Sequence, residues 1–175
     1  KAGDVLVEID TTISEAEQRR LQSELTTTEL EAARLRAALE ISDNPEADFT
    51  PPQEATQQQI ELQISQLTNQ VQEIRSQLTG LDSQIAQNKG NLVSVQATIK
   101  KLSQSIPLLK ERAGMRTYLS DKGYGSKLDT LTAQQDLIEH EQELNIEQGH
   151  LASAIAGVKS LQQQRQQAEA EFKQK

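Results

Sequence analysis

The stretch that decides the fold runs from Ile60 to Ala113 and reads IELQISQLTNQVQEIRSQLTGLDSQIAQNKGNLVSVQATIKKLSQSIPLLKERA. Large apolar residues recur through it in alternating steps of four and three, which places them on one stripe of an α-helix. A seven-residue repeat held over so many turns predicts a left-handed coiled coil. With Ile64 at heptad position a, the apolar residues at positions a and d are Ile60, Ile64, Leu67, Val71, Ile74, Leu78, Leu81, Ile85, Leu92, Val95, Ile99, Leu102, Ile106 and Leu109.

Two residues inside this stretch depart from the pattern. Asn88 is the one polar residue at a d position. It is either a tolerated polar contact or a residue that fixes the register of the coiled coil. Pro107 lies outside positions a and d. A proline there is expected to bend the helix or to remove one backbone hydrogen bond.

After the heptads, the sequence predicts a tight turn and a second helix. Gly123 and Gly125 stop the first helix within a turn over residues 120–126. Ser126 has the position of a helix N-cap and starts a return helix over residues 127–175. A short turn between two heptad helices predicts an antiparallel hairpin. The return helix carries a weaker repeat, which Arg165 interrupts, of Leu137, Leu144, Leu151, Ile155, Val158, Leu161, Ala168 and Phe172.

A shorter helix is expected before the hairpin. Thr12 and Glu15 have the spacing of a capping box and start a helix over residues 12–40. Residues 41–50 form a linker, because the residue before Pro45 is pushed away from helical angles. The apolar stripe of this first helix consists of Leu21, Leu25, Thr28, Ala32, Leu35 and Leu39.

Two further segments complete the predicted order. In residues 1–10 a Gly-Asp turn precedes a β-prone run with Val5, Val7 and Ile9 on one face, which predicts a β-strand whose sheet partners are missing. Thr50 can cap a new helix and Pro51 suits its first turn, so we predict a long heptad helix over residues 51–119. The predicted fold is all-α: a long antiparallel coiled-coil hairpin preceded by a shorter helix, with a remnant β-strand at the N-terminus. We expect the sequence to be a segment of a longer protein.

Composition excludes several classes of function. The chain of 175 residues has a net charge of −8, which argues against nucleic-acid binding. It has no Cys, so thiolate metal sites and disulfides are excluded. Its two histidines, His140 and His150, lack companions at metal-ligand spacing. A two-helix hairpin offers no concave pocket for catalysis. We therefore predict a non-enzymatic protein without a cofactor.

The order of these segments resembles a known family. A strand reading Gly-Asp-Val-Leu-Val-Glu-Ile-Asp at positions 3–10, a helix, a break, a heptad helix, a tight tip and a return helix follow one another. This order is similar to that of the HlyD family, the membrane fusion proteins that act as periplasmic adaptors of type I secretion systems. The resemblance implies that residues 1–10 are the remnant of a lipoyl-like domain. The break over 41–56 fits this secretion branch better than the simple hairpin of many drug-efflux adaptors.

The resemblance implies a docking site at the hairpin tip. In the wider adaptor superfamily, an Arg-Leu-Ser set at the tip meets the outer-membrane channel. Leu119 and Ser126 match the Leu-to-Ser spacing, and the arginine is either Arg112 or Arg116, because the expected position holds Met115. The structural alternative for Ser126 is its N-cap role. The remaining predicted tip residues are Gly123 and Gly125, which serve the turn, and Tyr124, a candidate apolar anchor.

The resemblance also implies partners and a location. The protein would lie in the periplasm, anchored to the inner membrane, and would link an ABC transporter to a TolC-like outer-membrane channel. Several copies, with six expected, would surround the path of a secreted protein. Two alternatives remain: an adaptor of a drug-efflux pump, or an unrelated coiled-coil tether.

A simple hairpin would leave apolar residues without a partner. The stripe of the first helix and the lower end of the long helix, around Ile60 and Ile64, would face water. Burial of such a side chain stabilises a protein by roughly 1.5–3 kcal/mol, so we expect the stripe to be covered. In the intact protein we expect the return helix to continue and cover the stripe. In the segment alone, either the first helix folds back on the long helix, or a second molecule covers both. We favour a second molecule, because an open coiled coil presents a ready-made seam.

Overall fold

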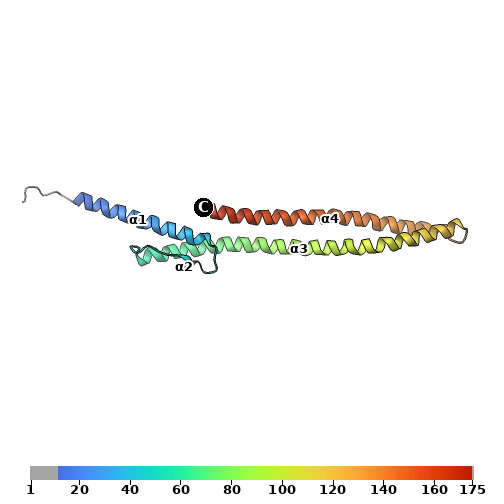
Figure 1. Cartoon of the computed structure of the whole chain (residues 1–175), viewed down its shortest axis with the longest axis horizontal. Helices are drawn as coiled ribbons and strands as arrows, with labels where there is room; N and C mark the ends of the chain where they lie inside the picture. The colour runs from blue at the N-terminus through green and yellow to red at the C-terminus, as the bar shows by residue number, and fades with distance from the viewer. Residues whose placement is uncertain (1–11, 175) are drawn as a thin grey trace, which may run out of the picture. The chain divides into compact units, whose positions relative to one another are not determined.

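The computed structural model describes residues 12–174, so the predicted strand over residues 1–10 lies outside the described part. Four α-helices follow one another there: α1 at Thr12–Leu39, α2 at Pro45–Asp48, α3 at Gln57–Asp121 and α4 at Lys127–Gln174 (Figure 1). No helix in residues 12–174 is long and apolar enough to cross a membrane. The helices form two compact units. One is Leu78–Ala168, and the other combines the described residues before Leu78 with those after Ala168.

The unit Leu78–Ala168 is an antiparallel hairpin of α3 and α4 (Figure 1). Residues late in α3 meet residues early in α4, as the ion pair of Arg112 with Asp136 shows. Farther from the turn, the Arg165 side chain of α4 donates to Asp82 of α3, with 2.7 Å between Nε and Oδ1. The predicted helical hairpin is therefore confirmed. Arg165 interrupts the apolar repeat of α4 without leaving a charge unpaired.

The seam of this hairpin follows the predicted heptads of α3. Large residues at its a and d positions are buried or half-buried. The predicted repeat of α4 faces them: Leu137, Leu144, Leu151, Val158 and Leu161 are half-buried, and the fully buried residues of α4 are small. Ile155, which was expected to broaden the stripe of α4, is half exposed to solvent, so that part of the prediction is wrong. The buried residues of the seam in this unit are Leu78, Ile85, Leu102, Ala113, Thr130, Ala133, Ala154 and Ala168.

Pro107 lies inside α3, which continues through it to Asp121. The ring is on the exposed side of the helix, away from the seam. A proline that removes a backbone hydrogen bond on the solvent side leaves the freed carbonyl accessible to water, so the helix need not end there.

In the other unit, α1 folds back on the beginning of α3. Leu30 and Ala37 of α1 share one apolar cluster with Leu67 and Val71 of α3. Figure 1 shows this part of α1 beside the start of α3. Of the two arrangements that the sequence left open, this structure shows the fold-back. The cluster is completed by Ala38 and Phe49, with Ala33, Ala55, Ile60, Ile64 and Phe172 packed against it.

The face of α1 that packs on α3 is not the predicted stripe. Leu30, Ala37 and Ala38 are buried there, whereas Leu25 of the predicted stripe is 58% exposed. The sequence left open what covers the predicted stripe, and in this structure α3 does not cover it.

The long helix α3 begins at Gln57, later than the predicted Pro51. Its capping box is formed by Thr56 and Gln59. The Thr56 N–H donates to Gln59 Oε1 at 3.0 Å, and the Gln59 N–H donates to Thr56 Oγ1 at 3.4 Å. The segment before it stays non-helical, with a turn in which the Ala55 N–H donates to the Pro52 carbonyl. This turn lets Ala55 join the same cluster as Phe49.

The chain has an unusual backbone conformation two residues after the end of α1. Ile41 has a φ of +47°, a left-handed conformation that a β-branched side chain rarely adopts. Its N–H donates to the Ala38 carbonyl at 3.2 Å, which closes the last turn of α1. The chain then passes through α2, where Pro45 occupies the first turn, and Arg75 of α3 pairs with Asp43 of this linker.

Candidate functional site: the hairpin tip

The turn between α3 and α4 is a glycine-terminated helix end. The Tyr124 N–H donates to the Leu119 carbonyl, and the Gly123 N–H donates to the Ser120 carbonyl, both at 2.9 Å. This pair of bonds is the Schellman motif, and Gly123 has the positive φ, +78°, that the motif requires.

Gly125, the second glycine of the turn, is required for a different reason. A Cβ on Gly125 would lie 2.9 Å from the Ser120 nitrogen and 3.1 Å from the Leu119 carbonyl carbon. No side chain fits against backbone atoms at such distances, so the turn between α3 and α4 can form only with glycine at this position.

Ser126 caps α4. Its hydroxyl oxygen accepts the Asp129 N–H at 3.4 Å, and its carbonyl accepts the Thr130 N–H at 3.1 Å. Thr130 is almost fully buried, and its hydroxyl lies 3.2 Å from the Arg116 carbonyl of α3. Thr130 therefore ties α4 to α3 just below the tip. The sequence did not indicate this role of Thr130, because a threonine in an apolar repeat resembles any other polar interruption.

Both candidate arginines pair across the hairpin. Arg112 forms an ion pair with Asp136, and Arg116 approaches Asp129, with 3.7 Å between the nitrogen and oxygen atoms. Their side chains remain about half exposed, at 49% and 51%. Each arginine thus holds α4 against α3 and still presents part of its guanidinium group to solvent.

Around the turn, large apolar side chains face solvent. Tyr124 is 85% exposed and Tyr118 is 63% exposed. A shallow hollow of about 360 Å³ lies on the α3 side and is lined by Gly114, Met115, Tyr118 and Leu119. We call this exposed region the tip surface. Its apolar members are Met115, Tyr118, Leu119, Tyr124, Leu128 and Leu131.

The sequence indicated only part of this surface. Leu119 and Tyr124 were predicted tip residues, whereas Tyr118 and Leu128 were not, and Met115 entered only as the position where an arginine was expected. The signal was nevertheless present, because large apolar residues outside the a and d series have no place in the seam.

The tip also differs from the rest of the chain in charge. Residues 110–127 carry a net charge of +3, although the whole chain has a net charge of −8. Asp129 and Asp136, which pair with Arg116 and Arg112, reduce the net charge of residues 110–136 to +1. The Lys122 ammonium group lies 5.8 Å from the centre of the Tyr118 ring, within range of a cation–π contact. The tip is therefore apolar and weakly basic, with its lysines outside these ion pairs.

Asn88, the polar residue in the α3 seam, is half-buried. Its amide donates to the Gln84 carbonyl of its own helix at 3.0 Å. Opposite it lies Gly157 of α4, where an added Cβ would be 3.6 Å from Asn88 Oδ1. This is an ordinary van der Waals distance, so the amide does not require glycine at this position.

Within residues 12–174, no group of three or more His, Cys, Asp or Glu side chains is placed to hold a metal ion. His140 lies 2.9 Å from the Asp136 carbonyl through Nδ1, and His150 lies 3.2 Å from Glu147 Oε1. Both histidines make local contacts within α4.

Comparison with known families gives one result that covers nearly the whole described part. A family model described as "AprE, long alpha-helical hairpin" matches residues 14–175. No curated protein matches the chain. The family match spans α1, the linker and both arms of the hairpin.

Proposed function

We propose that this chain forms the bridging hairpin of a type I secretion adaptor. The premise is that it belongs to the AprE long α-helical hairpin family, which consists of such adaptor proteins. The full-length adaptor would lie in the periplasm, anchored to the inner membrane. It would connect an ABC transporter to a TolC-like outer-membrane channel, and the hairpin tip would dock on the channel. Membership of the HlyD family is part of this proposal.

One observation carries the docking step: the tip surface exposes several large apolar side chains together with basic ones. Exposed apolar groups at the closed end of a helical hairpin contribute little to folding. They contribute much to binding, because aromatic and arginine side chains that become buried at an interface dominate its energy. The net positive charge of the tip favours a partner surface that carries carboxylates.

Further parts of the proposal follow from the family. Several copies, with six expected, would surround the path of a secreted protein, and ATP would be used by the transporter. A family match over residues 14–175 supports an adaptor over an unrelated coiled-coil tether. An adaptor of a drug-efflux pump remains the second candidate, and the transporter encoded with the full-length protein would distinguish the two.

The test is secretion by the full-length adaptor with Leu119→Asp or Tyr124→Asp. Both side chains are exposed, at 40% and 85%, so a carboxylate at either place should leave the helix content unchanged. We expect secretion to be lost, because an aspartate would be buried without a partner when the tip docks. The readouts are exported protein in the medium and circular dichroism of the purified variants.

The matched control is Val93→Asp. Val93 is also exposed, at 63%, and lies on α3 away from the turn. Secretion should continue with this variant. Normal export by both tip variants would remove the tip from the docking step.

A further inference from the structure

Helices α1 and α3 lie side by side, and two contacts fix the position of α1 along α3. Arg34 of α1 contacts Gln70 of α3, and Asp43, beyond the end of α1, contacts Arg75 farther along α3. The residue numbers of both partners increase together, so the two helices run in the same direction. These contacts define one register, and another register would slide α1 by about 1.5 Å for each residue of shift.

The apolar packing between the two helices does not by itself select this register. Leu30 and Ala37 of α1 pack with Leu67 and Val71 of α3. The apolar residues of α3 repeat every seven positions, so a shift of α1 by one heptad again places apolar side chains opposite one another. The repeat in this part of α3 consists of Ile60, Ile64, Leu67, Val71, Ile74 and Leu78.

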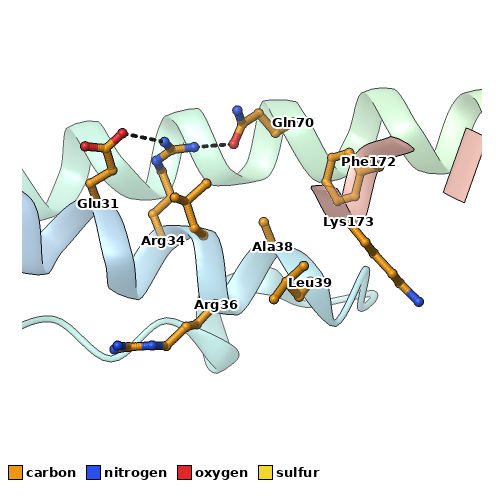
Figure 2. A pocket seen from close by; sticks show the side chains of 9 residues that line it. Glu31, Arg34, Arg36, Ala38, Leu39, Gln70, Phe172 and Lys173 are labelled. Atoms are coloured by element: carbon orange, nitrogen blue, oxygen red, sulfur yellow. Dashed lines mark hydrogen bonds and ion pairs between the residues drawn. The ribbon is translucent and has the colours of Figure 1, made fainter. Parts of the chain in front are cut away.

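The buried polar contact between α1 and α3 can also be repeated. Arg34 is 9% exposed, lines a hollow of about 320 Å³ and donates to the side-chain oxygen of Gln70 (Figure 2). Glutamine recurs at intervals of seven residues as Gln63, Gln70 and Gln77, so a shift by one heptad offers Arg34 another amide oxygen. At Gln63 this oxygen is buried and has no hydrogen-bond partner. Arg34 is therefore compatible with more than one register.

Arg75 supplies the contact that is not repeated. It forms an ion pair with Asp43, and its guanidinium group donates to the Ser42 carbonyl at 3.5 Å. Between residues 57 and 88 of α3, Arg75 is the one basic residue. No shifted register in this part of α3 can therefore offer Asp43 a second cation.

A shift by one heptad would replace Arg75 with a poorer neighbour of Asp43. Seven positions before Arg75 lies Thr68, and seven positions after it lies Asp82. Asp43 would lose its ion pair in one direction and meet a second carboxylate in the other. An exposed ion pair contributes little to overall stability, but a small difference in free energy is enough to select between registers whose other contacts are alike.

The start of the linker connects Asp43 to the end of α1. The Ile41 N–H donates to the Ala38 carbonyl at 3.2 Å, which continues the last turn of the helix. The Ser42 hydroxyl donates to the carboxylate of Asp48. These bonds keep the stretch compact, so a contact at Asp43 also holds the end of α1.

We propose that Arg75 is a positioning residue that selects the register of α1 on α3 through its contacts with Asp43 and Ser42. Without this residue, α1 occupies more than one register, including the register in which Arg34 meets Gln63. Each heptad of shift moves α1 by about 10 Å along α3. The register would thereby set the reach of a bridging adaptor. Only this consequence rests on the proposed function, and the register itself does not depend on docking by the tip.

The experiment measures the distance between spin labels on α1 and α3 in the full chain. The chain has no Cys, so Gln18→Cys with Ser76→Cys places one label at an exposed position of each helix. Labelled chains are diluted with unlabelled ones, so that pulsed electron resonance reports distances within one molecule. We expect a single distance in this protein. Adding Arg75→Ala should produce a second population displaced by about 10 Å, with the helix content in circular dichroism unchanged.

Further variants test whether the ion pair itself is responsible. Glu73→Ala removes a charge from an exposed position of α3 near Arg75 and is the matched control, which should keep the single distance. Asp43→Arg should produce the second population, as Arg75→Ala does. Combining Asp43→Arg with Arg75→Asp should restore the single distance, because the exchanged pair again attracts.

Three results would overturn the proposal. One is a single, unchanged distance in both Arg75→Ala and Asp43→Arg. Another is a second population that the exchanged pair fails to remove. The third is a broadened distance together with a loss of helix content, because Arg75 would then stabilise the fold as a whole instead of selecting its register.

Discussion

Gly123 and Gly125 lie two residues apart at the tip, yet the structure requires each for a different reason. Gly123 supplies a positive φ, and Gly125 leaves space for the backbone of Leu119 and Ser120. A substitution at Gly125 therefore meets backbone, which cannot move aside as a flexible side chain can.

We expect Gly125→Ala to lower the free energy of unfolding by about 1–3 kcal/mol, because the added Cβ would collide with the turn. The measurement is urea unfolding followed by circular dichroism. Gly90→Ala is the matched control, since nothing lies within 4 Å of a Cβ there. In a helix interior this change should stabilise the protein by about 1 kcal/mol. If both variants lost stability equally, the close packing at Gly125 would have no role.

For single residues, the sequence correctly indicated those whose role depends on near neighbours in the chain. The spacing of Ser126 and the glycines predicted the cap and the turn, because both depend on bonds within a few residues. It left Arg112 and Arg116 as alternatives, and the structure gives both a partner on α4. The ion pairs could not be predicted, because they depend on the register of α4 against α3.

Among the elements, α3 buries the heptad residues that its sequence indicates. Leu67 has no exposed surface, and Leu62 on the same helix is 57% exposed. The two leucines differ only in the face of α3 on which they lie.

Leu67→Ala should therefore lower the free energy of unfolding by about 2–5 kcal/mol, because it leaves a cavity between α1 and α3. Leu62→Ala should change it by less than about 0.5 kcal/mol. Chemical unfolding of both variants under one set of conditions gives the comparison. Similar losses for the two would mean that α1 does not pack on this face of α3.

The limits of sequence reasoning are clearest in α1. Its heptad leucines are regular, and they indicated the stripe that would be buried. The structure packs a different face of α1 on α3, with Leu30, Ala37 and Ala38 buried. Which of two apolar faces meets a neighbour is decided by the shape of that neighbour, and a single helix does not contain this information. In α3, by contrast, only one face is apolar, so its seam could be predicted.

Over the whole molecule, charge is distributed unevenly. The segment 110–127 is basic within a chain of net charge −8. Long-range attraction of this kind raises association rates with an acidic partner and is screened by salt within about 10 Å at 0.1 M.

Replacing Lys110, Lys122 and Lys127 by Glu should lower the association rate of the full-length adaptor with its channel by about tenfold or more at low salt. The difference should shrink at about 0.5 M salt, where exposed charges are screened. Surface plasmon resonance at both salt concentrations measures it. Replacing Lys100 and Lys101, which lie outside this segment, is the control and should have a smaller effect. A salt-independent difference would point to a local contact instead of long-range attraction.

The composition of the tip also gives the molecule an optical property. The chain has no tryptophan and two tyrosines, Tyr118 and Tyr124. Both rings lie at the tip and are exposed, at 63% and 85%. Near-ultraviolet absorption and intrinsic emission therefore originate almost entirely from one end of the hairpin. Tyrosine emission can therefore report events at the tip without a label, but it does not report on α1 or the linker.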